Sequence, residues 1–249
     1  MKINIVKNID ELSLLAARKI IERVRKQPTT VLGLATGSTP LGTYYKLVQD
    51  YRDNKTSYKH VTTFNLDEYV GLTSADQNSY NYYMREHLFK SININPNQTF
   101  LPNGVGIDPA IECDKYEAKI SESGGIDLQI LGLGENGHIG FNEPGTSFSS
   151  RTHVVSLAES TREANSRYFN SLSDVPTKAI TMGIETIMEA REVLLLVSGE
   201  RKAKVLREVL EGTITEKVPA TVLRNHSNIT IIADEAAVKC LTKHCQISS

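Results

Sequence analysis

The sequence predicts an α/β fold, a three-layer αβα arrangement in which helices cover both faces of a mostly parallel, Rossmann-like sheet. Three observations support this: short apolar segments recur along the chain, helical patterns fill most gaps between them, and glycine-containing turns follow several of their carboxyl ends. Strands and helices in repeated alternation are typical of a parallel sheet covered on both faces. The expected strands cover residues 2–6, 30–35, 61–66, 126–131, 179–183, 193–198 and 229–233.

The first expected helix follows the strand at residues 2–6. Asp10 is a natural N-cap, so we expect the helix to begin there. Apolar residues at helical spacing then supply one face. These residues are Leu12, Leu14, Leu15, Ile20 and Val24.

The most irregular stretch covers residues 93–109. Pro96, Pro102, Gly104 and Gly106 lie within it, and we expect a loop there. The sequence contains no internal repeat, low-complexity tract or linker rich in Pro, Gly or Ser. We therefore expect one domain over residues 1–249.

Composition excludes several classes of partner. The 249 residues are 40% hydrophobic and 23% charged, which suits an ordinary globular protein, and the formal net charge is -1. A net charge this small does not attract nucleic acid or an anionic membrane. An anionic substrate would therefore need a local binding site. No long apolar span is present, and the first 20 residues alternate like a strand and then become helical, unlike a signal peptide. We therefore expect a cytoplasmic protein.

The cysteines argue for a reducing compartment and against a metal site. Cys113, Cys240 and Cys245 are an odd number in a large chain. Cys240, His244 and Cys245 could ligate a metal, but no second cysteine pair completes a site. We expect no metal.

The segment 132–144 has the composition of an active site. It reads GLGENGHIGFNEP and follows an apolar strand. Ligands of open α/β sheets bind at the carboxyl ends of the strands. His138, Glu143 and Asn136 offer a proton carrier, an anion and an orienting amide, the parts needed for acid–base catalysis. The alternative is a surface loop with a solvated histidine.

The turn after the strand at 30–35 is a candidate phosphate-binding site. Thr36, Gly37, Ser38 and Thr39 are small enough for backbone N–H groups to approach an anion, and the following helix adds partial positive charge. The turn lacks the lysine of a Walker loop and the spacing of a dinucleotide motif, which favours a sugar phosphate. A plain helix cap is the alternative.

The strand at 61–66 ends in two acids, Asp67 and Glu68, at the same edge of the expected sheet as His138. Asp67 could act as a general base that reaches into the cleft. Alternatively, both acids could face water or cap the next helix.

A phosphate also needs positive charge. Arg162, Arg167 and Lys202 are the candidates, and Lys202 starts a helix at the ligand edge. Arg162 and Arg167 share an expected helix, and their spacing does not choose between them.

Four segments in this order resemble the glucosamine-6-phosphate deaminases, also called glucosamine-6-phosphate isomerases. They are LATGSTP at 34–40, NLDEYVG at 65–71, GLGENGHIGFNEP at 132–144 and TREANSRYF at 161–169. The resemblance covers nearly the whole chain, and FNEP is the piece that the related 6-phosphogluconolactonases lack. It implies a three-layer αβα fold and conversion of D-glucosamine 6-phosphate into D-fructose 6-phosphate and ammonia in amino-sugar catabolism.

The resemblance also implies roles for individual residues. Asp67 would take the C2 proton, and His138 would be the acid and base that opens the ring. Glu143 and Asn136 would orient and polarise that histidine. The phosphate would be held by the turn at 36–39 with Arg167 and Lys202. No metal or organic cofactor is implied.

Two departures from the family pattern bear on the expected activity. Some members have Asp in place of Asn136, so here Glu143 must supply the negative partner of the imidazole. Activated relatives bind N-acetylglucosamine 6-phosphate at a subunit interface through basic residues after FNEP. This chain has Arg151, His153 and Val155 there and a short tail, so we expect no such activation. The sequence leaves a homo-oligomer open.

Two rival functions remain. A 6-phosphogluconolactonase would use the same phosphate turn and His138 to activate water, with no evident need for Asp67 as a carbon-acid base. A sugar-phosphate sensor should carry a separate DNA-binding module, and the first expected strand begins at Lys2 with no room for one. We therefore expect the deaminase, and neither nucleic acid nor membrane as a partner.

Overall fold

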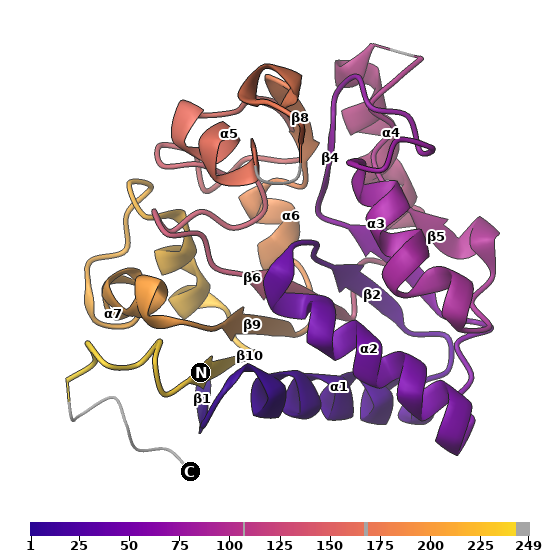
Figure 1. Ribbon diagram of the computed structural model, residues 1–249, viewed down its shortest axis with the longest axis horizontal. Coiled ribbons are helices and arrows are strands. Elements are labelled where there is room, and N and C mark those ends of the chain that lie inside the picture. The colour runs from indigo at the N-terminus through magenta and orange to yellow at the C-terminus, as the bar shows by residue number, and fades with distance from the viewer. Residues whose placement is uncertain (107, 167–168, 243–249) are drawn as a thin grey trace.

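The computed structural model describes residues 1–106, 108–166 and 169–242. Within these residues, seven parallel strands form the central sheet (Figure 1). In spatial order they are β1 (Lys2–Val6), β10 (Ile229–Asp234), β9 (Val193–Val197), β6 (Leu128–Gly132), β2 (Val31–Leu34), β3 (Thr62–Asn65) and β5 (Thr99–Phe100). This order confirms the predicted fold class.

Helices cover both faces of this sheet, as predicted (Figure 1). One face packs against α1 (Ile9–Lys26), α2 (Ser38–Asn54) and α3 (Tyr80–His87). The other packs against α4 (Pro109–Glu122), α6 (Ile184–Met188) and α7 (Ala203–Glu211). Single-turn 3₁₀ segments cover residues 89–91, 96–98, 172–174 and 200–202, and a longer one covers 219–225.

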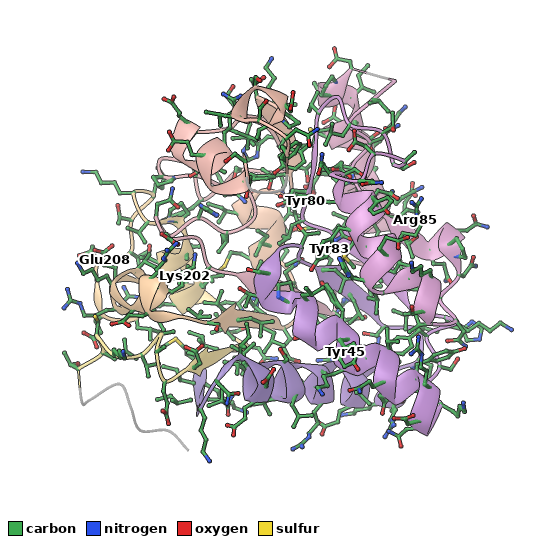
Figure 2. The ribbon with its side chains drawn as sticks, viewed as in Figure 1. Tyr45, Tyr80, Tyr83, Arg85, Lys202 and Glu208 are labelled. Carbon is green, nitrogen blue, oxygen red and sulfur yellow. The ribbon has the colours of Figure 1, made fainter. Side chains whose placement is uncertain are left out.

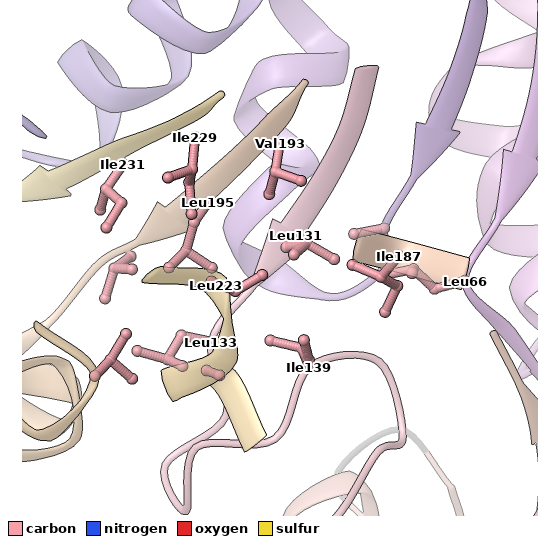
Figure 3. Packing of buried hydrophobic residues seen from close by; sticks show 14 of the residues in the cluster. Leu66, Leu131, Leu133, Ile139, Ile187, Val193, Leu195, Leu223, Ile229 and Ile231 are labelled. Carbon is pink, nitrogen blue, oxygen red and sulfur yellow. The ribbon is translucent and has the colours of Figure 1, made fainter. Parts of the chain in front are cut away.

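Alternating side chains of the buried strands form two separate cores. In β9, Leu194 and Leu196 join the core under α1 and α2, whereas Val193 and Leu195 join the opposite one. Figure 3 shows the latter core, where Leu195 lies between residues of β10 and Leu131 of β6. This alternation follows from the two-residue period of a strand. It explains why such strands read as continuous apolar runs.

A second, antiparallel sheet lies beside the central one. It joins β4 (Asp67–Tyr69), β8 (Lys178–Thr181) and β7 (His153–Ser156). The strand expected at 179–183 was therefore wrongly placed in the parallel sheet. Sequence reading missed β4, β7 and the edge strand β5, which lies in the stretch expected to be a loop. These strands have only two to four residues, too few for a periodic pattern to emerge.

The first helix begins earlier than predicted. Asn8 is its N-cap, and the Asn8 side chain accepts hydrogen bonds from the backbone N–H groups of Asp10 and Glu11 at 3.1 and 3.0 Å. Asp10 instead lies in the first turn, where its charge complements the helix dipole. Leu14 was wrongly placed on the apolar face, since it is 47% exposed. Within the described residues, no helix is long and apolar enough to cross a membrane.

Candidate active site

The loop after β6 carries His138 in a tight turn. The backbone N–H of Gly134 donates to the carbonyl of His138 at 2.9 Å, and the N–H of His138 donates to Asn136 Oδ1 at 3.2 Å. A Cβ atom on Gly134 would lie 2.3 Å from Cε1 of the His138 ring. Only glycine therefore allows the ring to pack against this backbone. The turn sets the position of the imidazole.

A hydrogen-bonded chain runs from the imidazole to a carboxylate. His138 Nδ1 lies 2.6 Å from Asn136 Oδ1, and Asn136 Nδ2 donates to Glu143 Oε2 at 2.7 Å. An amide oxygen can only accept, so Nδ1 carries the proton when the ring is neutral and Nε2 is left as a base. Glu143 Oε2 also lies 3.7 Å from Nδ1 and supplies the charge that Asn136 lacks.

Partial burial favours the neutral form of this imidazole. Desolvation is the main cause of a lowered pKa at His138; the Glu143 carboxylate opposes it, and the Lys202 cation adds to it. A neutral ring can accept a proton, as a general base does.

Asp67 lies in β4, close to the same loop. A Cβ atom on Gly140 of the loop would come within 3.5 Å of Asp67 Oδ2. The Asp67 side chain is buried, and burial followed by repulsion from Glu68 raises its pKa to about 8. A carboxylate sheltered in this way is a much stronger base than one in water.

Glu68 has a different task from Asp67. Its carboxylate accepts hydrogen bonds from the backbone N–H groups of Tyr69, Tyr80 and Asn81 at 2.9, 3.0 and 2.9 Å. Burial raises its pKa to about 7, against these three hydrogen bonds. Since Tyr80 and Asn81 open α3, the suggestion that both acids cap the next helix holds for Glu68 and not for Asp67.

The turn at Thr36–Thr39 leads into α2 without a side-chain cap. Gly37 is the N-cap residue, with φ 95° and no side-chain hydrogen bond. That φ favours glycine, so the helix has the cap considered from the sequence, with no side-chain acceptor at it. The Gly37 carbonyl accepts a hydrogen bond from Tyr83 Oη at 2.7 Å. The first turn of a 17-residue helix thus offers backbone N–H groups and partial positive charge to an anion.

Two of the candidate cations, Lys202 and Arg162, lie in different surroundings. Lys202 lies at the start of α7 (Figure 2), close enough to His138 to lower the pKa of that ring. Arg162 donates to the carbonyl oxygens of Leu172 and Val175 at 2.9 and 3.1 Å, so it braces a neighbouring loop. Arg167 lies outside the described residues.

Thr161 is a site residue that sequence reasoning missed. Its hydroxyl donates to Glu143 Oε1, the carboxylate oxygen that Asn136 does not use. The signal available was its place in the segment TREANSRYF, from which only the arginines were considered as candidate site residues.

The part of the chain that the structure describes contains no candidate metal site. No group of three or more His, Cys, Asp or Glu residues there could hold a metal ion. Of the three ligands considered from the sequence, His244 and Cys245 lie outside the described residues.

A buried carboxylate and a relayed imidazole at the carboxyl edge of a parallel sheet define an acid–base enzyme of α/β architecture. The chain belongs to the family described as glucosamine-6-phosphate isomerases/6-phosphogluconolactonase, whose model matches residues 7–232.

Two relatives with high sequence identity are both named glucosamine-6-phosphate deaminase. Glucosamine-6-phosphate deaminase from Halalkalibacterium halodurans is 56% identical over 239 residues, which are 96% of this chain and 97% of that one. The enzyme of the same name from Geobacillus sp. is 57% identical over 238 residues, 96% of this chain and 95% of that one.

Solved structures agree on the fold. A protein described as a monomeric glucosamine-6-phosphate deaminase is similar with a TM-score of 0.95 and 49% identity, over 96% of this chain and all of that one. The 6-phosphogluconolactonase of Trypanosoma brucei is similar with a TM-score of 0.76 and 22% identity, over 97% of this chain and 98% of that one. The latter likeness shows the shared fold alone.

Proposed function

We propose that this chain is a glucosamine-6-phosphate deaminase, which converts D-glucosamine 6-phosphate and water into D-fructose 6-phosphate and ammonia. The observation that carries the proposal is the buried Asp67 carboxylate beside the loop of His138, since a lactone hydrolase has no evident need for a carbon-acid base. The names of relatives that are 56 and 57% identical support it. The net reaction consumes water and breaks a C–N bond, so it is a hydrolytic deamination joined to an isomerisation.

Ring opening is the task of His138 in this proposal. The anomeric hydroxyl gives its proton to Nε2, the C1–O5 bond breaks, and the imidazolium returns the proton to O5. Asn136 holds Nδ1 at 2.6 Å so that Nε2 faces the sugar. Glu143 steadies the transient imidazolium through its charge at 3.7 Å.

Asp67 then moves a proton from C2 to C1. It removes the C2 proton of the open-chain aldehyde, O1 takes up a proton to give an enolamine, and Asp67 returns a proton to C1 as the nitrogen releases one. The product is an imine at C2, which water hydrolyses to the ketone and ammonia. A desolvated carboxylate suits this step, because the C2 proton beside a carbonyl is only weakly acidic.

The phosphate end would be held by the turn at residues 36–39. Backbone N–H groups at the start of α2 would bind its oxygens, and Lys202 with Arg167 would supply positive charge. We infer a place in amino-sugar catabolism, including breakdown of N-acetylglucosamine and N-acetylneuraminate. The monomeric state described for the relative at 49% identity favours a monomer here over a homo-oligomer.

Offering the purified protein two substrates in parallel tests this function. We expect ammonia and fructose 6-phosphate from glucosamine 6-phosphate, and no hydrolysis of 6-phosphogluconolactone above the spontaneous rate. Lactone hydrolysis without ammonia release would move the chain to the other activity in the family description.

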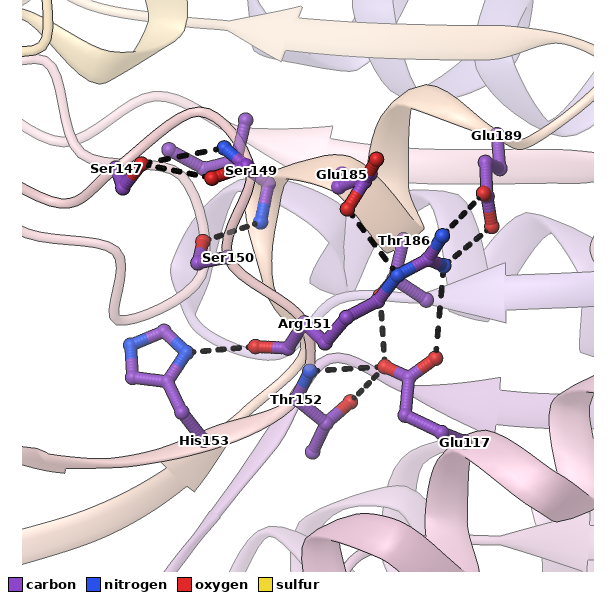
Figure 4. A network of polar contacts seen from close by, with 11 residues as sticks. Glu117, Ser147, Ser149, Ser150, Arg151, Thr152, His153, Glu185, Thr186 and Glu189 are labelled. Atoms are coloured by element: carbon purple, nitrogen blue, oxygen red, sulfur yellow. Dashed lines mark hydrogen bonds and ion pairs between the residues drawn. The ribbon is translucent and has the colours of Figure 1, made fainter.

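N-acetylglucosamine 6-phosphate should not activate this enzyme. Arg151, in the segment where activated relatives carry basic residues, is already paired with three carboxylates (Figure 4): Glu189 binds it through both oxygens, Glu185 lies 3.3 Å away and Glu117 lies 3.8 Å away. These contacts raise the pKa of its guanidinium. A compensated cation offers little to a phosphate, and Val155 adds no charge.

The measurement is the substrate concentration that gives half-maximal ammonia release, with and without N-acetylglucosamine 6-phosphate. We expect no decrease in this concentration. Inorganic phosphate at the same concentration serves as the control for simple competition at the active site. A clear decrease with the acetylated sugar alone would contradict the prediction.

A further inference from the structure

We infer that Thr161 is a positioning residue for the acid–base chain, through which helix α5 (Glu159–Asn165) holds the Glu143 carboxylate toward Asn136 and His138. The inference rests on the proposed function. The Thr161 side chain is buried, and its hydroxyl donates to Glu143 Oε1, while Asn136 Nδ2 donates to Oε2 at 2.7 Å. Each carboxylate oxygen therefore has its own donor.

Two hydrogen-bond donors restrain the orientation of the Glu143 carboxylate more than one donor would. The last side-chain torsion of a glutamate is broad, so a carboxylate held through one oxygen is less restrained than one held through both. With Thr161 in place, Oε2 stays on Asn136 and 3.7 Å from His138 Nδ1. The hydroxyl thus acts on the imidazole through Glu143 and need not touch substrate.

Helix α5 also contacts the other half of the site. Asn165 Nδ2, at the end of this helix, donates to Tyr69 Oη at 3.0 Å, and Tyr69 follows Asp67 by two residues in β4. One short helix therefore bonds to the carboxylate behind His138 and to the strand of the proposed carbon base. Its placement sets the two catalytic groups relative to one another.

The test compares Thr161→Val with Thr161→Ser. Valine keeps the branched shape and loses the hydroxyl, whereas serine keeps the hydroxyl. We expect Thr161→Val to lower kcat for ammonia release by roughly 10-fold or more, and Thr161→Ser to stay within about 3-fold of the parent. KM should change little, because Thr161 bonds to Glu143 and not to the turn at 36–39. Melting temperatures show whether either variant is unfolded.

A second readout follows the titration of His138 by NMR in the free protein. Glu143 raises the pKa of His138, while burial and Lys202 lower it. A carboxylate released by Thr161→Val would support the imidazolium less, so the His138 titration should move to lower pH. Thr161→Ser should leave it in place.

The outcomes separate the two proposals. Parental kcat and an unmoved His138 titration in a folded Thr161→Val protein would overturn the inference. So would a Thr161→Ser variant that loses as much as the valine variant, because shape and not the hydroxyl would then matter. If the parent itself releases no ammonia, the proposed function fails, and the His138 titration still decides whether Thr161 positions Glu143.

Discussion

Replacing Asp67 with Asn lowers kcat for ammonia release by roughly 10²–10⁴-fold, the usual contribution of a positioned general base. The amide keeps the size and shape of the side chain but cannot accept the C2 proton. Steady-state assays measure the loss. Glu68→Gln is the matched control, since it changes the adjacent acid, which bonds to backbone N–H groups of β4 and α3. Equal losses in the two variants would remove Asp67 from its assigned role.

The raised pKa of Asp67 links activity to pH. A base must be ionised to act, so kcat/KM of the parent should rise with pH through about 8. A profile that is already flat at about pH 6 would contradict a sheltered Asp67.

The same pKa links stability to pH with a definite sign. The folded-state pKa of about 8 lies above the ordinary value of 3.8, so the folded protein binds a proton that the unfolded chain has lost between these values. The contribution of Asp67 to stability therefore falls as pH rises across this window and is lowest above about pH 8. Asp67→Asn, which never ionises, should melt above the parent at about pH 9 and close to it at about pH 4. A variant that melts below the parent at the higher pH would contradict this.

Replacing His138 with Gln should slow the reaction of the cyclic substrate by roughly 10²–10³-fold. Glutamine can hydrogen-bond but cannot carry a proton from the anomeric hydroxyl to the ring oxygen near neutral pH. Ring opening would then limit the rate.

Substrate labelled with deuterium at C2 distinguishes this variant from the Asp67 variant. If ring opening limits the rate in His138→Gln, its isotope effect falls toward unity, because the C2–H bond breaks after the slow step. Residual turnover by Asp67→Asn should instead keep a full isotope effect. A full isotope effect in the His138 variant would show that the imidazole does not serve ring opening.

The sequence determined the parallel sheet and the position of the site along the chain. Buried strands such as Val193–Val197 carry their signal locally, in consecutive apolar residues. The carboxyl ends of parallel strands meet at one edge, so polar residues after β3 and β6 could be placed at a common site before any contact was known. Asp67 and His138 were proposed as site residues in this way.

Only the tertiary structure decided how these residues are arranged. The pairing of β4 with β8 and the bond from Thr161 to Glu143 join segments that are far apart in sequence, and no local periodicity encodes such a pairing. The structure also distinguished Asp67, the proposed base, from Glu68, which accepts hydrogen bonds from backbone N–H groups. Both carboxyls are buried, so the backbone hydrogen bonds to Glu68 make this distinction, and they depend on what surrounds a side chain in space.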